Sequence, residues 1–223
     1  MLFKIEQIIL FFLLLLFFIN SIYSEKELII DEILAIVGNE AITLSDLKII
    51  IYFNLYPDIE KREIKKYIER MINQKIIKKK IKMNFSLEKE INNEMERLIK
   101  WFGSEKKLSQ ELLKFDLNWS DLKAYLEEKI YFDKVIMDRF KFISPITLDE
   151  IKKYYNEIYV PEQRKKKLYP KSLLEVASEI ESIITKQKRK KLISDWLKDL
   201  KKGEDIEIKV KDFGKLLTQI KYK

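Results

Sequence analysis

The stretch that decides the fold is DEILAIVGNEAITLSDL, residues 31–47. The apolar, β-branched run from Ile29 to Val37 predicts a strand, and the Gly-Asn dipeptide that follows predicts a tight turn into a short return strand. Thr43 then occupies an N-cap position, because its hydroxyl can accept from the amide three residues on while Asp46 reaches back. The stretch therefore predicts a β-hairpin that leads directly into a helix.

A further strand is expected near the other end of the chain. Ile206, Ile208 and Val210 alternate with charged residues between Asp205 and Val210, which is the pattern of an edge strand. A strand without a neighbour leaves backbone groups unpaired, and the other expected strands are those of the hairpin. We therefore predict that both ends of the chain meet in one small sheet and that the helices between them form a single lobe.

Helices are expected to fill the interval, so the predicted fold class is mostly α with a small sheet. Of the 223 residues 36% are charged and 47% are apolar, with only four Gly and four Pro, which is a helical composition. Capping residues and helical spacing of apolar residues predict a helix after Thr43 and further helices at 57–81, 86–102, 104–114, 119–142, 147–155 and 172–202.

The first residues read as an export signal. Lys4 supplies the positive start, and the unbroken apolar run Ile8–Ile19 is within the length of a signal-peptide core and shorter than a membrane span. Ser24 is a small residue at a plausible cleavage point, and a cut after Ser21 is also possible. We therefore expect an exported, periplasmic protein, with an uncleaved membrane anchor as the alternative.

The predicted organisation has five parts. Residues 1–24 form the signal peptide, 25–158 a helical domain, 159–171 a charged linker, 172–210 a helix and strand that pack back on the helical domain, and 211–223 a loose tail.

Several kinds of chemistry are excluded by composition. The chain contains no His and no Cys, which removes the common catalytic triads and zinc sites, and it has no phosphate-binding Gly-rich motif. We expect no cofactor, no metal and no nucleotide. The net charge is +8, with dense basic runs at 75–82, 164–171 and 186–191. These runs fit solvated helix faces, an anionic membrane face or acidic client proteins, and the export signal argues against nucleic acid.

Four segments resemble SurA-like periplasmic chaperones. They are the opening at 31–47, Leu117-Asn-Trp-Ser-Asp-Leu122, the Thr147-x-x-Glu-Ile-x-x-Tyr-Tyr155 helix, and the closing helix and strand from Ser172 to Ile208. The resemblance covers essentially the whole chain after the leader. It implies that 25–158 is a SurA N-terminal-like helical chaperone domain, which binds unfolded clients on their way to the outer membrane.

The chain departs from that family at one place. Family members usually carry parvulin-type prolyl isomerase domains, which use paired histidines, before the closing helix. Here only Asn156–Lys171 occupies that position, and the chain has no His. We therefore expect no enzymatic activity.

The leading functional prediction is an ATP-independent holdase for unfolded outer-membrane or exported proteins, in contact with the outer-membrane assembly machinery. The alternatives are a non-catalytic adaptor or subunit of an envelope assembly complex, and a prolyl isomerase homologue without activity. The candidate client-binding residues are aromatic: Trp101, Phe102, Phe115, Trp119, Tyr125 and Tyr131.

Overall fold

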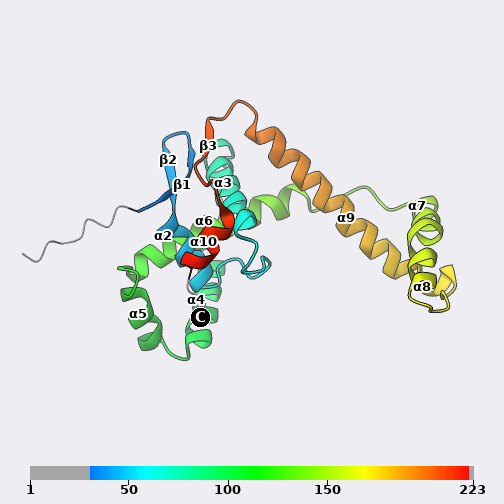
Figure 1. Cartoon of the computed structure of the whole chain (residues 1–223), viewed down its shortest axis with the longest axis horizontal. Helices are drawn as coiled ribbons and strands as arrows, with labels where there is room; N and C mark the ends of the chain where they lie inside the picture. The colour runs from blue at the N-terminus through cyan, green and yellow to red at the C-terminus, as the bar shows by residue number, and fades with distance from the viewer. Residues whose placement is uncertain (1–30, 221–223) are drawn as a thin grey trace, which may run out of the picture. The chain divides into compact units, whose positions relative to one another are not determined.

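The computed structural model of the chain describes residues 31–220. The expected signal peptide, and the first residues of the expected N-terminal strand, lie outside this range. The described part is mostly helical with one three-stranded antiparallel sheet, as predicted. The strands are β1 (Ile33–Val37), β2 (Glu40–Thr43) and β3 (Ile206–Ile208), in the order β2-β1-β3 (Figure 1).

The sheet joins the two ends of the described chain. The Gly38 amide donates to the Asp205 carbonyl at 2.8 Å, and the Lys209 amide donates to the Leu34 carbonyl at 2.9 Å. Gly38 has a φ of +59°, a conformation that glycine adopts without strain in a hairpin turn. The predicted pairing of the C-terminal strand with the hairpin is confirmed, with β3 beside β1.

The helices that follow the hairpin begin at the predicted caps in most cases. They are α2 (Leu44–Tyr52), α3 (Ile64–Lys80), α4 (Glu88–Phe102), α5 (Glu105–Leu113) and α6 (Trp119–Arg139). Thr43 with Asp46 and Asn118 with Asp121 form complete capping boxes, and Ser104 caps α5. Short-range polar chemistry therefore sets these helix starts.

Two helix starts differ from the prediction. The helix expected from residue 57 begins only at Ile64, because residues 56–63 form turns closed by bonds such as Ile59 N–H to the Tyr56 carbonyl at 3.1 Å. The helix expected after Ser86 begins at Glu88 with Leu87 at the cap. The Ser86 carbonyl accepts a hydrogen bond from Lys134 Nζ at 3.1 Å, so this residue is tied to α6.

The predicted linker is largely helical. The segments α7 (Leu148–Tyr154), η1 (Tyr155–Tyr159, a π-helix) and α8 (Val160–Lys165) follow one another without a break. Val160 N–H donates to the Tyr155 carbonyl five residues back. A wider π turn therefore lies just before Pro161, and the helix continues on its other side as α8. The prediction of a linker at 159–171 is therefore wrong for 159–165, and the connection to α9 (Leu173–Lys201) is a short loop.

The prediction of a loose tail after residue 210 is also wrong. Residues Phe213–Gln219 form α10, whose first amides are capped by the Asp212 carboxylate. Leu216 and Ile220 are buried in the main core, at 3% and 5% exposure. The apolar residues of this segment recur at helical spacing, so one face of α10 packs inward.

The apolar interior of the described chain has more than one centre. The main core lies among the sheet, α2 to α6 and α10. A neighbouring cluster joins α3 and α6 to the last third of α9 through Ile77, Phe132, Val135 and Trp196. A further cluster, formed by Ile151, Val176, Ile180 and Ile184, lies between α7 and α9 and shares no residue with the main core. Glu32–Lys223 is one compact unit, as the single-lobe prediction expects, but its interior is divided.

Candidate functional site

Three of the six predicted contact residues meet in one aromatic cluster. The Phe102 ring lies 5.6 Å from Phe53 and 4.9 Å from Trp101, and the Phe115 ring lies 5.6 Å from Phe53. Phe102 is 7% exposed and Phe115 packs against the main core, whereas Trp101 is 40% exposed. Phe102 is therefore a core residue, and Trp101 is the member of the cluster with a large open face.

The other three predicted residues use their polar atoms to join elements. Trp119 Nε1 donates to Ser109 Oγ at 3.1 Å, which ties the start of α6 to α5. The Tyr125 hydroxyl donates to Asp46 Oδ1 at 2.6 Å, which ties α6 to the start of α2. Both rings are half-buried against the main core. These contacts are structural, and they leave part of each ring at the surface.

Tyr131 differs because it lines an open groove. Its hydroxyl donates to the Ile81 carbonyl at 2.6 Å and accepts from the Met83 amide at 3.0 Å, so it holds the extended link between α3 and α4. The groove has a volume of about 500 Å³ and is lined by Lys78, Lys82, Met83, Asn84, Ala124, Glu127, Glu128 and Tyr131. We refer to it as the Met83 groove.

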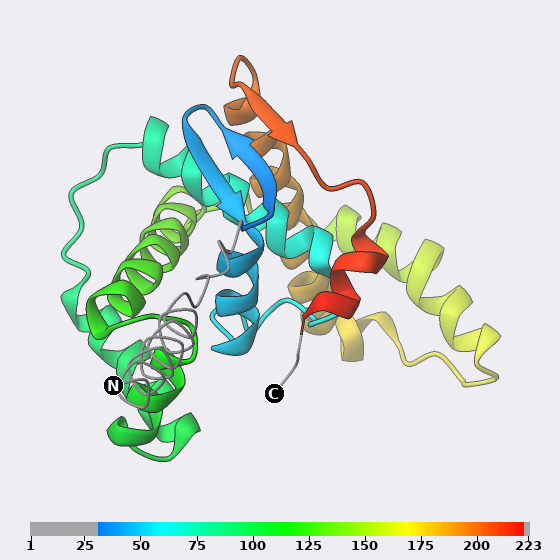
Figure 2. The same ribbon diagram turned by 60° about the vertical axis from the view of Figure 1, so that its left-hand side comes forward.

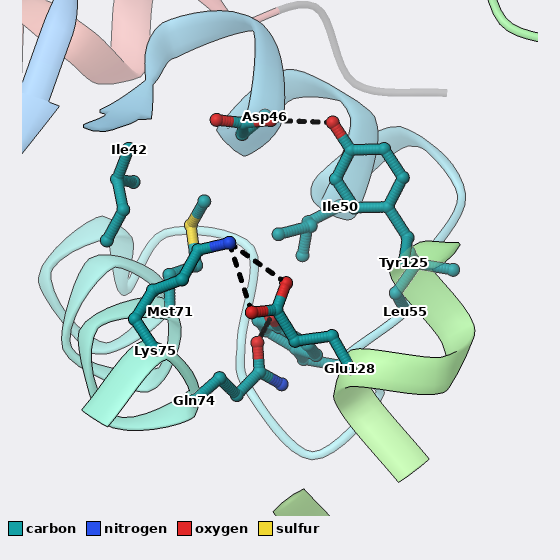
Figure 3. Close-up of a pocket in the computed structure, with 10 residues that line it drawn as sticks. Ile42, Asp46, Ile50, Leu55, Met71, Gln74, Lys75, Tyr125 and Glu128 are labelled. Atoms are coloured by element: carbon teal, nitrogen blue, oxygen red, sulfur yellow. Dashed lines mark hydrogen bonds and ion pairs between the residues drawn. The ribbon is translucent and has the colours of Figure 1, made fainter. Parts of the chain in front are cut away.

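Beside α2 and α3, a small interior pocket contains charged side chains (Figure 3). Lys75 Nζ lies 3.0 Å from Glu128 Oε1 and 3.2 Å from a Glu40 carboxylate oxygen. The Tyr56 hydroxyl donates to Gln74 Oε1 at 2.5 Å. The pocket holds about 30 Å³, room for a water molecule, and the Gln74 amide nitrogen is buried without a protein partner.

The charges of this pocket stabilise one another. Burial alone would lower the pKa of Lys75, but the carboxylates of Glu128 and Glu40 outweigh it and raise the pKa of Lys75 above its usual value. Lys75 therefore stays protonated and paired. We interpret the pocket as a polar junction that fixes α3 against α6 and β2.

A second ionic group lies further along the same two helices. Arg70 pairs with Asp133, and Lys129 Nζ lies 3.3 Å from Glu94 and 3.5 Å from Asp133. Burial raises the pKa of Asp133 although both cations oppose this shift. The Arg70 guanidinium also lies 4.0 Å from the centroid of the Phe132 ring, within cation–π range. This group orders α3, α4 and α6 beneath an open surface.

That open surface is a second groove with an apolar and cationic lining. It has a volume of about 400 Å³ and is lined by Arg70, Phe132, Asp133, Ile136, Met137, Phe140, Lys141 and Arg189. Met137 is 65% exposed, and Phe142, which directly follows the lining residue Lys141, is 85% exposed. The Trp196 ring of α9 packs edge-on against the Phe140 ring, with the ring centroids 5.6 Å apart. We refer to this groove, together with Phe142, as the Met137 groove.

The sequence reasoning missed the Met137 groove for an identifiable reason. It selected aromatic residues that were judged not to fit the core, and in the structure most of these contact the core. A usable signal was present near the C-terminal end of α6. Met137 follows Ile136 directly and lies outside the apolar stripe of the helix, so it does not fit the buried face. Phe142 gave no such signal, because the helix was expected to reach residue 142, whereas α6 ends at Arg139.

None of the helices at 31–220 is long and apolar enough to cross a bilayer. Within the same range, no group of three or more acidic side chains is arranged to hold a metal ion. Compared with known proteins, the chain matches no family model, and no curated protein is significantly similar to it.

Proposed function

We propose that this protein is an ATP-independent holdase, which binds unfolded exported polypeptides in the periplasm and keeps them from aggregating. The observation that carries the proposal is the Met137 groove, where Met137 and Phe142 remain exposed beside cationic side chains. The resemblance of the opening, capping and closing segments to SurA-like chaperones supports the same function.

The lining of the groove suits a variable, unfolded partner. Met is unbranched and adapts to partners of different shape, and the neighbouring aromatic rings offer large apolar contact area. Arg189 and Lys141 add positive charge at the rim, which would attract acidic segments of a client. Outer-membrane β-barrel proteins expose alternating apolar and polar residues when unfolded, so they match this chemistry.

The binding is expected to be weak at each contact. A groove of about 400 Å³ accommodates only a few side chains, and a long client would use several such contacts. Weak contacts dissociate quickly, so handover needs no nucleotide. The Met83 groove, also on α6, is a second contact of this kind.

The experiment is suppression of aggregation by residues 25–223, which contain the whole compact unit Glu32–Lys223. A chemically unfolded outer-membrane β-barrel protein is diluted into buffer without nucleotide, and light scattering is followed. We expect suppression near stoichiometric ratios. Suppression should extend to several unrelated unfolded proteins, because an adaptor with one fixed partner would lack that breadth.

The groove is tested by the double variant Met137→Ser, Phe142→Ser. Burial of each side chain contributes about 1.5–3 kcal/mol at most, so loss of both should weaken suppression roughly tenfold or more. Leu113→Ser is the control, since Leu113 is 70% exposed on α5. Absence of suppression by the folded wild-type chain would refute the holdase and favour the adaptor. If the double variant suppresses aggregation as well as the Leu113→Ser control does, the Met137 groove is not the binding surface.

A further inference from the structure

The loop between α8 and α9 combines dense positive charge with exposed apolar side chains. Leu168, Tyr169 and Leu174 are 55%, 99% and 91% exposed. No Asp or Glu occurs from Gln163 to Leu174, and the same interval contains five cations: Arg164, Lys165, Lys166, Lys167 and Lys171. We refer to residues 164–174 as the basic tip.

The basic tip is a hydrogen-bonded turn that connects the two arms of a helical hairpin. Lys188 of α9 pairs with Glu150 of α7 at 2.6 Å, and the Tyr155 hydroxyl donates to the Lys171 carbonyl at 2.8 Å, so α7 and α9 run antiparallel. The Leu168 amide donates to the Gln163 carbonyl at 2.9 Å. Figure 2 shows this loop in yellow, where the continuous helix of α7, η1 and α8 ends.

The exposure of the apolar residues follows from how the hairpin packs. Leu173 packs against the cluster between α7 and α9, where Val176 and Ile180 are buried. Leu174, the next residue, faces solvent on the other side of the helix start. Leu168 and Tyr169 precede the capping box of Ser172 and Glu175, which fixes where α9 begins. Exposed apolar groups on an ordered turn are typical of a surface that another phase or molecule covers.

We propose that the basic tip binds the surface of an anionic phospholipid membrane. Leu168, Tyr169 and Leu174 enter the boundary between headgroups and acyl chains, and the five cations contact lipid phosphates. Tyr is favoured at this boundary because its ring is apolar and its hydroxyl is polar. Basic residues next to an apolar insertion add attraction to anionic lipid, and Lys side chains can bury their stems while the ammonium stays in water.

A membrane fits the basic tip better than an acidic polypeptide does. Tyr169 of the tip is almost completely exposed, and none of the tip residues lines the Met83 or Met137 groove. The tip needs no groove to contact a flat, charged membrane surface. Its apolar side chains need to reach only the boundary between the lipid headgroups and the acyl chains. The inference is independent of the holdase proposal.

The first test is cosedimentation of residues 25–223 with lipid vesicles, a chain that lacks the apolar run of the leader. Vesicles of mixed phosphatidylglycerol and phosphatidylcholine should bind it, vesicles of phosphatidylcholine alone should bind far less, and added salt should weaken binding. The variant Lys165→Gln, Lys166→Gln should bind roughly thirtyfold more weakly. The charge-matched control Lys186→Gln, Lys190→Gln removes two equally exposed cations from α9 and should change binding much less.

The second test measures insertion directly. The chain has no Cys, so Tyr169→Cys provides a single site for an environment-sensitive fluorophore. Nitroxide-labelled lipid should quench this probe on binding to the mixed vesicles. The same probe at Leu113→Cys on α5 should not be quenched.

Specific outcomes would overturn the inference. These are equal binding to both kinds of vesicle, a loss of binding in the control that matches the loss in the tip variant, or no quenching at position 169. If the tip variant binds vesicles normally but loses affinity for an unfolded acidic polypeptide, the tip is a client contact and the membrane inference is wrong. Circular dichroism of each variant verifies that it remains folded.

Discussion

At the scale of single residues, Tyr125 shows how one hydroxyl joins two elements. Asp46 accepts from Tyr125 through Oδ1 at 2.6 Å and from the Thr43 amide through Oδ2 at 2.9 Å. The same carboxylate therefore caps α2 and holds α6. A predicted aromatic contact residue thus contributes to the fold through its polar atom.

Removing this hydroxyl should destabilise the protein. Tyr125→Phe leaves Asp46 Oδ1 without its hydrogen-bond donor. We therefore expect a loss of about 1–2 kcal/mol in the free energy of unfolding at neutral pH. Urea unfolding followed by circular dichroism measures it. Tyr169→Phe, at a 99% exposed position, should leave the free energy unchanged.

The pH dependence of this loss follows from the proton balance. Burial, assisted by Asp46, raises the pKa of Tyr125 well above its usual range, and burial with Glu111 raises the pKa of Tyr52 to about 12. The folded state therefore keeps protons that the unfolded chain releases near pH 10, so stability falls above about pH 10. In wild type, Tyr125 contributes to this fall by about 1.4 kcal/mol per pH unit. The Tyr125→Phe penalty should therefore shrink above about pH 10, and a penalty unchanged at about pH 11 would contradict this account.

At the scale of elements, α10 shows that a short C-terminal helix can be part of the core. Leu216 is 3% exposed and packs in the main core, and the Asp212 carboxylate satisfies the Gly214 and Lys215 amides. These two contributions order a segment that the sequence reasoning treated as a tail.

Truncation of its buried side chain should affect the whole domain. Leu216→Ala should lower the free energy of unfolding by about 2–5 kcal/mol, the range for a buried leucine. Lys215→Ala on the exposed face of the same helix is the control, and it should change stability by less than about 0.5 kcal/mol. A Leu216→Ala chain as stable as wild type would mean that the tail is loose after all.

Local chemistry explains which elements could be predicted from the sequence. The hairpin turn at Gly38 and the capping boxes of Thr43, Asn118 and Thr147 each involve three or four neighbouring residues, so their signals are visible in the chain itself. The helix through Pro161 was not predictable in the same way. It contains a π turn whose Tyr155 and Tyr159 side chains pack against the cluster between α7 and α9, so its partners are distant in the sequence.

Candidate site residues were harder to predict because residue type does not fix burial. Phe102 and Phe142 are both phenylalanines near a helix end, yet one is 7% and the other 85% exposed. The difference lies in the partners that the fold brings to Phe102, namely Phe53 and Trp101. A surface such as the Met137 groove becomes visible only when those partners are placed.

At the scale of the whole described chain, α9 belongs to two apolar clusters. Near its end, Trp196, Leu197 and Leu200 pack with α3 and α6. Near its start, Val176 and Ile180 pack with α7. The cluster at the start has only four buried residues, so it has little stability of its own and should open without unfolding of the main core.

We therefore expect Ile180→Ala to separate the two clusters. Ile180 is 1% exposed, and its truncation costs about 2–5 kcal/mol, which is more than a cluster of this size can lose. Amide hydrogen exchange should show loss of protection in α7 and at the start of α9, with protection in α3 retained. Ile68→Ala, at an equally buried position of the main core, should instead lower protection in α3 and leave protection in α7 unchanged, because α7 exchanges through its own local opening. A different result would contradict this account: Ile180→Ala could lower protection in α3 and in α7 by the same factor. The main core and the cluster between α7 and α9 would then be one cooperative unit, because only a shared unfolding transition couples their exchange in that way.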